Sequence, residues 1–439
     1  MEYDLKEMRE KWFSHRKKKQ DPPLPEPLPK KRGAPQGHPG WFRKKPKKID
    51  EVEQVTLEKC PQCGSASLSE CEGTEDHIQE DIVIPELRVT LYRRHYYWCK
   101  GCKNVVHGYG KEEMPNSYIG PNAKAFSSFL REGVKVSQRN IQKIFERFGL
   151  KICNASVPGF HNQARKKGMS LYEQLKEAIK KAPWVHGDET GSRLDGKNYW
   201  NWIFATSRIC LHVVRETRGG KVVEEILGKK FNGILLADFF CAYNQLEALA
   251  KQRCLVHLLR ELKKALECST PGDPIYVWCK KLKDLIQEAI DLAEEYEKKI
   301  ISKEQFELDR TQIQQTLQDF QFSDPTYKIL QRLSKRLTRH KNEIFTFLDY
   351  PGIPYHNNHA EQLLRNTVLL RKITFGYRSI HGVLNHEVLM SLYQTAHLNG
   401  KDPIALFKRI LISRDKKLPL SLCLRTSSPP ILSACLPAP

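Results

Sequence analysis

The sequence predicts a protein of the α/β class, in which a mixed sheet is followed by a helical insertion and preceded by a small cysteine-rich module. Three observations carry this prediction. Strand and helix patterns alternate through residues 183–260, residues 275–345 have the apolar spacing of charged amphipathic helices, and two Cys-x-x-Cys pairs lie between residues 60 and 102. A chain of 439 residues is long enough for roughly two to four such units.

The composition points to a polyanionic partner. The formal net charge is +21, while hydrophobic residues make up 40% of the chain and are sufficient for a core. Such a surplus favours nucleic acid first and an anionic membrane surface second. The sequence has no apolar run of about 18 residues and no secretory signal, so no membrane span is expected. The thirteen scattered cysteines favour a reducing, cytoplasmic setting over a disulfide framework.

The composition of residues 1–54 predicts a disordered arm. This segment is basic, rich in proline and poor in apolar residues, so it cannot bury enough surface to offset the entropy of ordering. Two interpretations are equally compatible with it. One is a solvated linker, and the other is an arm that tracks DNA phosphates with cations that include Lys44 and Lys45.

Residues 55–110 predict a zinc ribbon. Cys60 and Cys63 form one Cys-x-x-Cys pair, and Cys99 and Cys102 form the other, with strand-like runs between them. Two such turns present four thiolates to one tetrahedral Zn²⁺ ion. The less favoured alternative is four unrelated cysteines. Cys71 is not expected to be a ligand, because it has no partner at short spacing.

Residues 111–180 predict a helical segment. Ser137 is expected to open a helix that places Ile141 and Phe145 on one face, and a longer helical pattern follows. Short helices broken by glycine suit a DNA-binding helix-turn-helix. A plain helical spacer explains the same pattern equally well.

Residues 181–400 predict the α/β domain, with a sheet that is antiparallel at first and parallel later. A helical insertion at about 268–345 interrupts it, and residues 401–439 are expected to form a C-terminal helix and a disordered tail. The expected elements are a strand ending in 184–190, a strand pair at 198–207 and 209–217, a helix at 221–228, a strand at 233–239, a helix at 243–252, and a strand turning into a helix over 254–266.

Three acids stand out by their context. Asp188 is expected at the end of the first strand, Asp238 at the end of the buried strand, and Glu361 at the start of a helix. Carboxylates are the ligands that Mg²⁺ prefers, and two such ions can activate an attacking oxygen and stabilise a leaving one. Each acid also has a structural explanation, because Asp188 and Asp238 could be helix N-caps and Asn358 with Glu361 resembles a capping box.

The blocks around these acids resemble the transposases of the insertion sequence 66 family, over about residues 30–410. The matching motifs are Asp188-Glu189-Thr190, Asp238 followed by Cys254, His257 and Arg260, and Asn357-Asn358-His359-Ala360-Glu361, together with the paired cysteines. The resemblance implies a ribonuclease H-like core with a helical insertion. It also implies an Asp-Asp-Glu site that uses Mg²⁺ or Mn²⁺ to cut and join DNA at element ends.

Several cations near these blocks are candidate DNA ligands. His257 and Arg260 lie one helical turn apart and are equally compatible with holding a phosphate and with packing. Contacts with the DNA backbone are also expected from Arg365, Arg371 and Lys372, although a solvated face is an alternative.

The expected partners are double-stranded DNA, both element ends and target, a second copy of the chain in a synaptic complex, and accessory proteins of the element. The expected setting is the nucleoid of a bacterium or an archaeon. Two alternative functions remain: a ribonuclease H-like nuclease without strand transfer, and a zinc-ribbon DNA-binding protein with an inactive catalytic domain.

Overall fold

The computed structural model describes residues 48–52, 58, 62, 64–66, 78–80, 85–320 and 328–425. The chain divides into two compact units, Met1–Ile82 and Val83–Pro439, and the elements below belong to the second. Some predicted features lie outside the described residues: Lys44, Lys45, Cys60, Cys63 and the end of the tail from residue 426.

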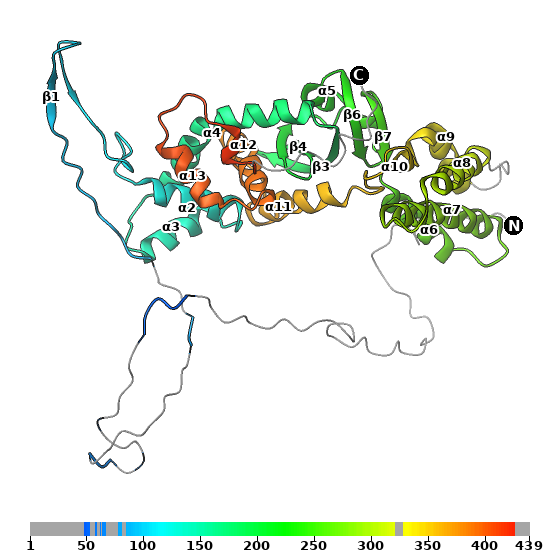
Figure 1. The fold of residues 1–439 in the computed structure, drawn as a ribbon, viewed down its shortest axis with the longest axis horizontal. Helices are drawn as coiled ribbons and strands as arrows, with labels where there is room; N and C mark the ends of the chain where they lie inside the picture. Colours follow the sequence, from blue (N-terminus) through cyan, green and yellow to red (C-terminus); the bar gives the residue numbers. More distant parts are fainter. Residues whose placement is uncertain are drawn as a thin grey trace. The chain divides into compact units, whose positions relative to one another are not determined.

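A five-stranded mixed sheet lies at the centre of the second unit (Figure 1). Its strand order is β5-β4-β3-β6-β7, in which β5, β4 and β3 are antiparallel and β3, β6 and β7 are parallel. This confirms the predicted change from antiparallel to parallel pairing. The strands are β3 (Trp184–Leu194), β4 (Lys197–Ala205), β5 (Cys210–Arg215), β6 (Lys230–Ala237) and β7 (Glu247–Arg253).

Strand β3 is longer than the sequence predicts. It continues to Leu194 because Asp195 and Gly196, both with positive φ, turn the chain tightly into β4. The expectation that Asp188 ends the strand is therefore wrong. However, the parallel pairing of β3 with β6 stops at His186. Asp188 therefore lies two residues beyond the last residue of β3 that pairs with β6.

The segment between β6 and α6 differs from the prediction. Residues 243–252, expected as a helix, form the end of a 3-10 turn (η1, Cys241–Tyr243) and most of β7, while helix α6 (Leu255–Glu267) begins directly after Cys254. Glu, Leu, Ala and Lys favour helices in isolation, but parallel pairing with β6 overrides that weak preference. Leu249, an apolar residue of the predicted helix, is about half exposed on this strand.

Helices cover both faces of the sheet. Alternate residues of β4 face opposite layers, so that Trp202 and Phe204 join the cluster that contains Leu175 of α4, while Ile203 packs in the cluster of Leu364 of α11. Figure 1 shows α4 and α11 on opposite sides of β3 and β4. The covering helices are α4 (Ser156–Lys180), α5 (Lys221–Leu227), α11 (Asn358–Thr374), α12 (Ile380–Leu398) and α13 (Pro403–Ile412).

Helix α11 is tied to β3 beyond its C-terminal end. The amide of Tyr377 donates to the carbonyl of Arg193 at 2.8 Å, and the carbonyl of Tyr377 accepts from the amide of Asp195 at 2.9 Å. Leu194 and Tyr377 also form an isolated parallel bridge. The connection between α11 and α12 is therefore fixed to the tip of the β3–β4 hairpin.

The predicted helices between β7 and α11 are present and have a core of their own. The helices form a hydrophobic cluster that is separate from the cluster on the sheet and includes Leu262, Leu282 and Leu333. Figure 1 shows these helices grouped beside the sheet. They are α6, α7 (Pro274–Glu297), α8 (Lys303–Asp319), α9 (Lys328–Arg339), the turn η2 (Lys341–Glu343) and α10 (Thr346–Asp349).

Two antiparallel strands and two helices precede α4. Ser137 caps α3 by accepting from the amide of Asn140, and Ile141 and Phe145 are buried, as predicted. The strand-like runs were predicted at 81–89 and 91–98, but residues 85–95 form no strand, and only the end of the second run belongs to β1. Strand β2 follows the second cysteine pair and was not predicted. The elements are β1 (Tyr96–Cys99), β2 (Asn104–His107), α2 (Pro121–Glu132) and α3 (Gln138–Arg147).

The chain after α13 packs against the sheet cluster. Leu418 and Cys423, which flank the turn η3 (Leu420–Leu422), are buried in it. The tail that the sequence predicts as disordered begins at Leu418, and this prediction is wrong for residues 418–425. No helix in the described part of the chain combines the length and apolarity that a membrane crossing requires.

Candidate active site

Three elements bring the predicted acids together. Asp188 lies within β3, Asp238 directly follows β6, and Glu361 occupies the first turn of α11. Burial, Glu189, Asp238 and Glu361 together raise the pKa of Asp188 to about 8, against the opposing effect of a hydrogen bond from the Glu189 amide. The three acids thus lie within electrostatic range of one another, and the site favours a bound cation.

The structure does not support the capping alternatives. Asp188 lies inside a strand, and Asp238 accepts from the amide of Phe240 at 2.8 Å in a tight turn rather than at a helix start. Helix α11 has no side-chain cap, and Oε1 of Glu361 is buried without a hydrogen-bond partner. Helix capping therefore does not explain why acids stand at these positions.

Asn357 fixes the start of α11 against β3. Its Nδ2 donates to the carbonyl of Gly187 at 2.8 Å, and its Oδ1 lies 2.8 Å from Nδ1 of His186. Its amide also donates to Sγ of Cys254 at 3.2 Å. Asn357 is almost fully buried, so these bonds place Glu361 relative to Asp188. The sequence motif contained Asn357, but sequence reasoning assigned it no role.

Glu189 is a further carboxylate that sequence reasoning missed as a site residue. Its side chain is buried, and it accepts from the hydroxyl of Tyr243 at 2.6 Å and from Nη2 of Arg218 at 2.7 Å. Burial raises the pKa of Glu189, while the bonds from Tyr243 and Arg218 lower it. The guanidinium of Arg218 lies over the rings of Trp200 and Phe240, at 4.6 and 3.8 Å.

Five of the predicted DNA-binding cations lie in the described part of the chain, and two of these lie close to the candidate site. Nδ1 of His257 lies 3.8 Å from Oε1 of Glu361. Nη1 of Arg371 donates to Oγ1 of Thr190 at 3.3 Å, on the strand that carries Asp188. The remaining three lie exposed on helix surfaces: Arg260, Arg365 and Lys372.

The candidate metal ligands fall into two groups, one with oxygen donors and one with sulfur donors. Asp188, Asp238 and Glu361 offer oxygen atoms only, which suits a hard cation such as Mg²⁺. Cys99 and Cys102 lie at the turn between β1 and β2, where hydrogen bonds from Cys102 and from the Gly101 amide lower the pKa of Cys99. A thiol that loses its proton readily suits Zn²⁺.

Two family models match the chain. The model described as Transposase IS66 family matches residues 135–384, more than half of the chain. The model described as the zinc-finger binding domain of transposase IS66 matches residues 58–103, which contain all four cysteines of the two pairs. The predicted family resemblance is therefore confirmed.

Two similar proteins come from Sinorhizobium fredii, and they match very different lengths of the chain. The chain is 24% identical over 419 residues to "Uncharacterized protein y4jD", which covers 85% of this chain and 78% of that protein. It is 38% identical over 74 residues to "Uncharacterized protein y4jO", which covers 17% of this chain and 23% of that protein. Neither name states an activity.

Proposed function

The chain belongs to the IS66 family of transposases, and from that premise we propose that it cuts and joins DNA at the ends of an insertion element. Asp188, Asp238 and Glu361 are the proposed catalytic residues and ligands of Mg²⁺ or Mn²⁺. The proposed core is ribonuclease H-like, which the strand order β5-β4-β3-β6-β7 supports. The proposed domain boundaries are those expected from the sequence, except that the chain up to residue 425 belongs with the sheet cluster and not with a disordered tail.

The electrostatic coupling of the three acids is the observation that carries this proposal. Asp238 and Glu361 come from separate elements, yet both raise the pKa of Asp188. Partly buried carboxylates that repel one another are unfavourable in a fold unless a cation or a proton compensates them. A set of oxygen donors in a strongly basic chain fits phosphodiester chemistry better than a structural role.

The divalent ion would neutralise charge on the phosphate and activate the attacking oxygen. The residues of the chain would hold this arrangement. Asn357 orients the first turn of α11, and Arg218 and Tyr243 occupy the oxygens of Glu189. Asp188 accepts from the Glu189 amide with Oδ1, so it is the acid of β3 that keeps an oxygen for a cation. Arg371, bonded to Thr190, is placed to attract the DNA backbone.

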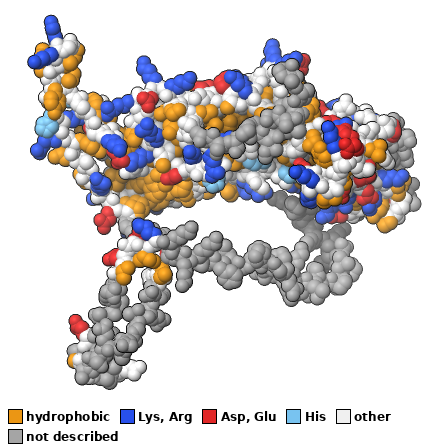
Figure 2. Space-filling model, in the orientation of Figure 1, with side chains coloured by type: hydrophobic (Ala, Val, Ile, Leu, Met, Phe, Trp, Pro, Cys, Tyr) orange, Lys and Arg blue, Asp and Glu red, His pale blue; other side chains and the backbone are white. Residues whose placement is uncertain are grey.

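The proposed partners are double-stranded DNA, a second copy of the chain and accessory proteins of the element, in the nucleoid. Figure 2 shows Lys and Arg side chains spread over the visible face of the second unit. Proposed phosphate contacts come from Arg260, Arg365 and Lys372, which are exposed, and from Lys44 and Lys45. The helices α2 and α3 are proposed to read DNA.

The second proposed ion is structural Zn²⁺, held by Cys60, Cys63, Cys99 and Cys102. It would supply the cross-link between the two cysteine pairs. The hairpin of β1 and β2 exposes the aromatic side chains of Tyr97 and Trp98. A hairpin this small is marginal on its own, and its exposed aromatic residues are available for packing. Both properties suit a module in which another part of the chain covers the hairpin and a bound ion stabilises it.

The test is a cleavage and joining assay with the element's flanking ends in Mg²⁺, comparing wild type with Asp238→Ala. We expect cleaved and joined products from wild type alone, while both proteins bind the DNA equally. Cleavage without joining would favour the nuclease alternative. Binding without cleavage by either protein would favour a DNA-binding protein with an inactive catalytic domain.

A further inference from the structure

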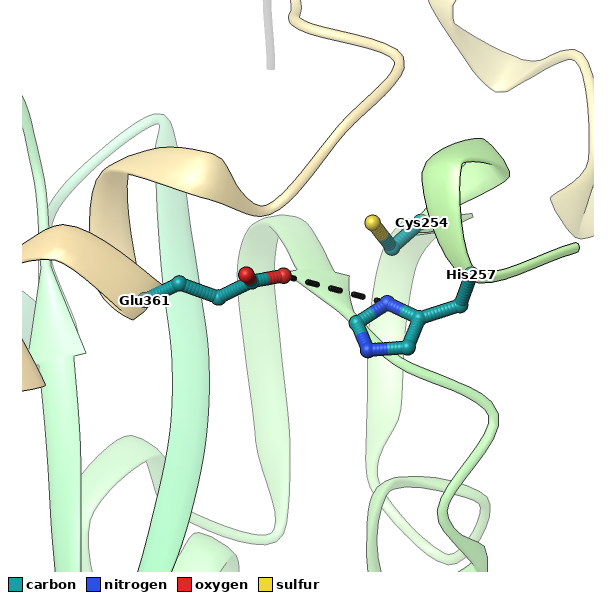
Figure 3. A group of neighbouring side chains, drawn as sticks. All are labelled: Cys254, His257 and Glu361. Atoms are coloured by element: carbon teal, nitrogen blue, oxygen red, sulfur yellow. Dashed lines mark ion pairs between the residues drawn. The ribbon is translucent and has the colours of Figure 1, made fainter. Parts of the chain in front are cut away.

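A second group of donor atoms lies beside the three acids. Cys254 immediately precedes α6, His257 lies in its first turn, and Glu361 lies in the first turn of α11. Ligand atoms of these three side chains all lie within 4.8 Å of one another. Figure 3 shows the imidazole of His257 directed toward the carboxylate, with the sulfur of Cys254 beside them.

Two atoms of this group lack the hydrogen bonds that buried polar atoms normally make. Nδ1 of His257 and Oε1 of Glu361 are both buried and have no hydrogen-bond partner. They lie 3.8 Å apart, which is too far for a hydrogen bond between them. Unsatisfied buried atoms of this kind call for an explanation, and a bound ion is a recognised one.

Cys254 is held in place as the third donor. Its Sγ accepts from the amide of Asn357 at 3.2 Å, and the residue is buried. The same Asn357 fixes the start of α11, so one residue positions both the sulfur and Glu361. The three donors therefore come from the N-terminal ends of α6 and α11, and Asn357 makes hydrogen bonds that position both ends.

We propose that Cys254, His257 and Glu361 bind a thiophilic divalent cation of the Zn²⁺ class. Sulfur, imidazole nitrogen and carboxylate oxygen are all ligands of zinc, and three protein ligands leave a fourth position for water or phosphate. Mg²⁺ prefers oxygen and does not select for sulfur, so this site differs in metal preference from the proposed site of the three acids. Binding displaces the thiol proton of Cys254 to solvent.

The position of Glu361 implies that zinc at this site affects cleavage, an implication that rests on the proposed function. Glu361 belongs to both donor sets, and a carboxylate oxygen that binds zinc beside His257 is withdrawn from the magnesium site. Zinc is then an inhibitor that competes with Mg²⁺ for Glu361. The state of the chain with zinc bound at this site retains DNA binding but does not cut.

The test counts zinc ions bound by the full-length chain at equilibrium, without DNA. Cys254→Ser removes the thiolate, while its hydroxyl still accepts from the Asn357 amide. Cys279→Ser is the matched control, because Cys279 is equally buried but lies in the core of the helical insertion. We expect Cys254→Ser and His257→Ala to bind one zinc ion fewer than wild type, and Cys279→Ser to bind as many as wild type.

Co²⁺ provides a second readout, because a thiolate ligand gives Co²⁺ a charge-transfer absorption band. Wild type and Cys279→Ser should show more of this band than Cys254→Ser, whatever the other cysteines contribute. Equal zinc counts and equal bands in all four proteins would overturn the proposal. Loss of zinc in Cys279→Ser as well would also overturn it, since the loss would then follow disturbance of the fold.

Activity separates this inference from the proposed function. If wild type cleaves DNA in Mg²⁺, added zinc should slow it by about tenfold or more, and Cys254→Ser should be slowed less, in line with typical losses when a ligand sphere is disturbed. Equal inhibition of both proteins would overturn the coupling through Glu361. A chain that binds the extra zinc but never cleaves would contradict the proposed function and leave the metal site standing.

Discussion

The carboxylate site and the cysteine hairpin are both proposed to hold cations, but they are supported in opposite ways. Asp188 and Asp238 stand on a sheet whose strands are buried, as Ile203 and Leu235 show, and Glu361 stands on a helix that packs against this sheet. The hairpin has two strands of four residues each, and Trp98, next to Cys99, is 63% exposed. At the first site the fold brings the ligands together, whereas at the second the ion has to help form the fold.

The energetics of the two sites differ accordingly. A two-stranded hairpin is marginal in water, so an ion that cross-links it contributes folding free energy. The acids repel one another at the partly buried edge of a stable core, so an ion there would relieve repulsion that the fold already tolerates. Loss of metal should therefore unfold one region and leave the other intact.

The largest expected effect is the response to chelation. Removal of zinc should abolish the protection of backbone amides in β1 and β2, because structural zinc contributes about 10–16 kcal/mol in zinc-finger peptides. Amides of β3 and β6 should keep their protection. Hydrogen exchange followed by mass spectrometry measures both regions in one experiment, and Cys99→Ser should reproduce the effect without chelator. Equal loss in both regions would break the comparison.

Asp188→Asn should affect activity and stability in opposite directions. Cleavage should fall by on the order of a thousandfold or more, comparable with removing a key electrostatic group. The free energy of unfolding without metal should rise by about 0.5–2 kcal/mol, because one repelling carboxylate is removed. Urea unfolding and the cleavage assay measure the two effects.

The control for this substitution is Asp284→Asn, on the exposed surface of α7. It should change neither quantity appreciably. A fall in stability for Asp188→Asn would show that the core does not bear the repulsion inferred from the neighbouring acids.

Asn357→Ala tests how the fold places Glu361. It removes the bonds to Gly187 and His186 and leaves both groups buried without their partner. The free energy of unfolding should fall by about 2–4 kcal/mol. Asn358→Ala, at the adjacent and less buried position, should cost less than about 0.5 kcal/mol. Similar losses for the two variants would refute the anchoring role of Asn357.

The smallest effect concerns pH. Burial lowers the pKa of His161 from 6.5 to about 4, so the unfolded chain binds more protons between these values. The stability contributed by neutral His161 is complete above pH 6.5 and is lost as the pH falls toward 4. His161→Gln should therefore flatten the decline in unfolding free energy by up to about 1.4 kcal/mol per pH unit.

Urea unfolding at pH 7, 6 and 5 measures this decline. His381→Gln, at an exposed position, is the control and should keep the slope of wild type. An unchanged slope in His161→Gln would mean that the fold accommodates the charged imidazole.

Much of the sheet could be predicted from the sequence, because strand patterns are local signals. The blocks around Asp188, Asp238 and Glu361 indicated through a family resemblance that these acids come together, which the structure shows, while their catalytic role stays a prediction. Strand β7 could not be predicted, since Glu247–Arg253 has helix-favouring residues and its pairing with β6 is a tertiary effect. The full length of β3 depends on a turn at Asp195 and Gly196, which the strand pattern alone does not predict.

The supporting residues of the site were the least predictable. The role of Asn357 depends on contacts with Gly187 and Cys254, which lie 170 and 103 residues away. Glu189 stands next to Asp188, and only the partners Arg218 and Tyr243 distinguish a bonded carboxylate from a free one. Spacing along the chain contains no information about such partners.

Helix α11 is fastened to β3 near both ends, by Asn357 at its start and by Tyr377 after its end. The length of the helix must therefore match the strand, because each residue added or removed changes the rise by about 1.5 Å and turns the helix by roughly 100°. Insertions and deletions should be tolerated in the loop between α7 and α8, which connects helices of a separate core. Between Glu361 and Thr374, even a single-residue deletion should break the hydrogen bonds of either Asn357 or Tyr377 to β3. Substitutions should therefore be tolerated in this stretch, whereas changes of its length should not.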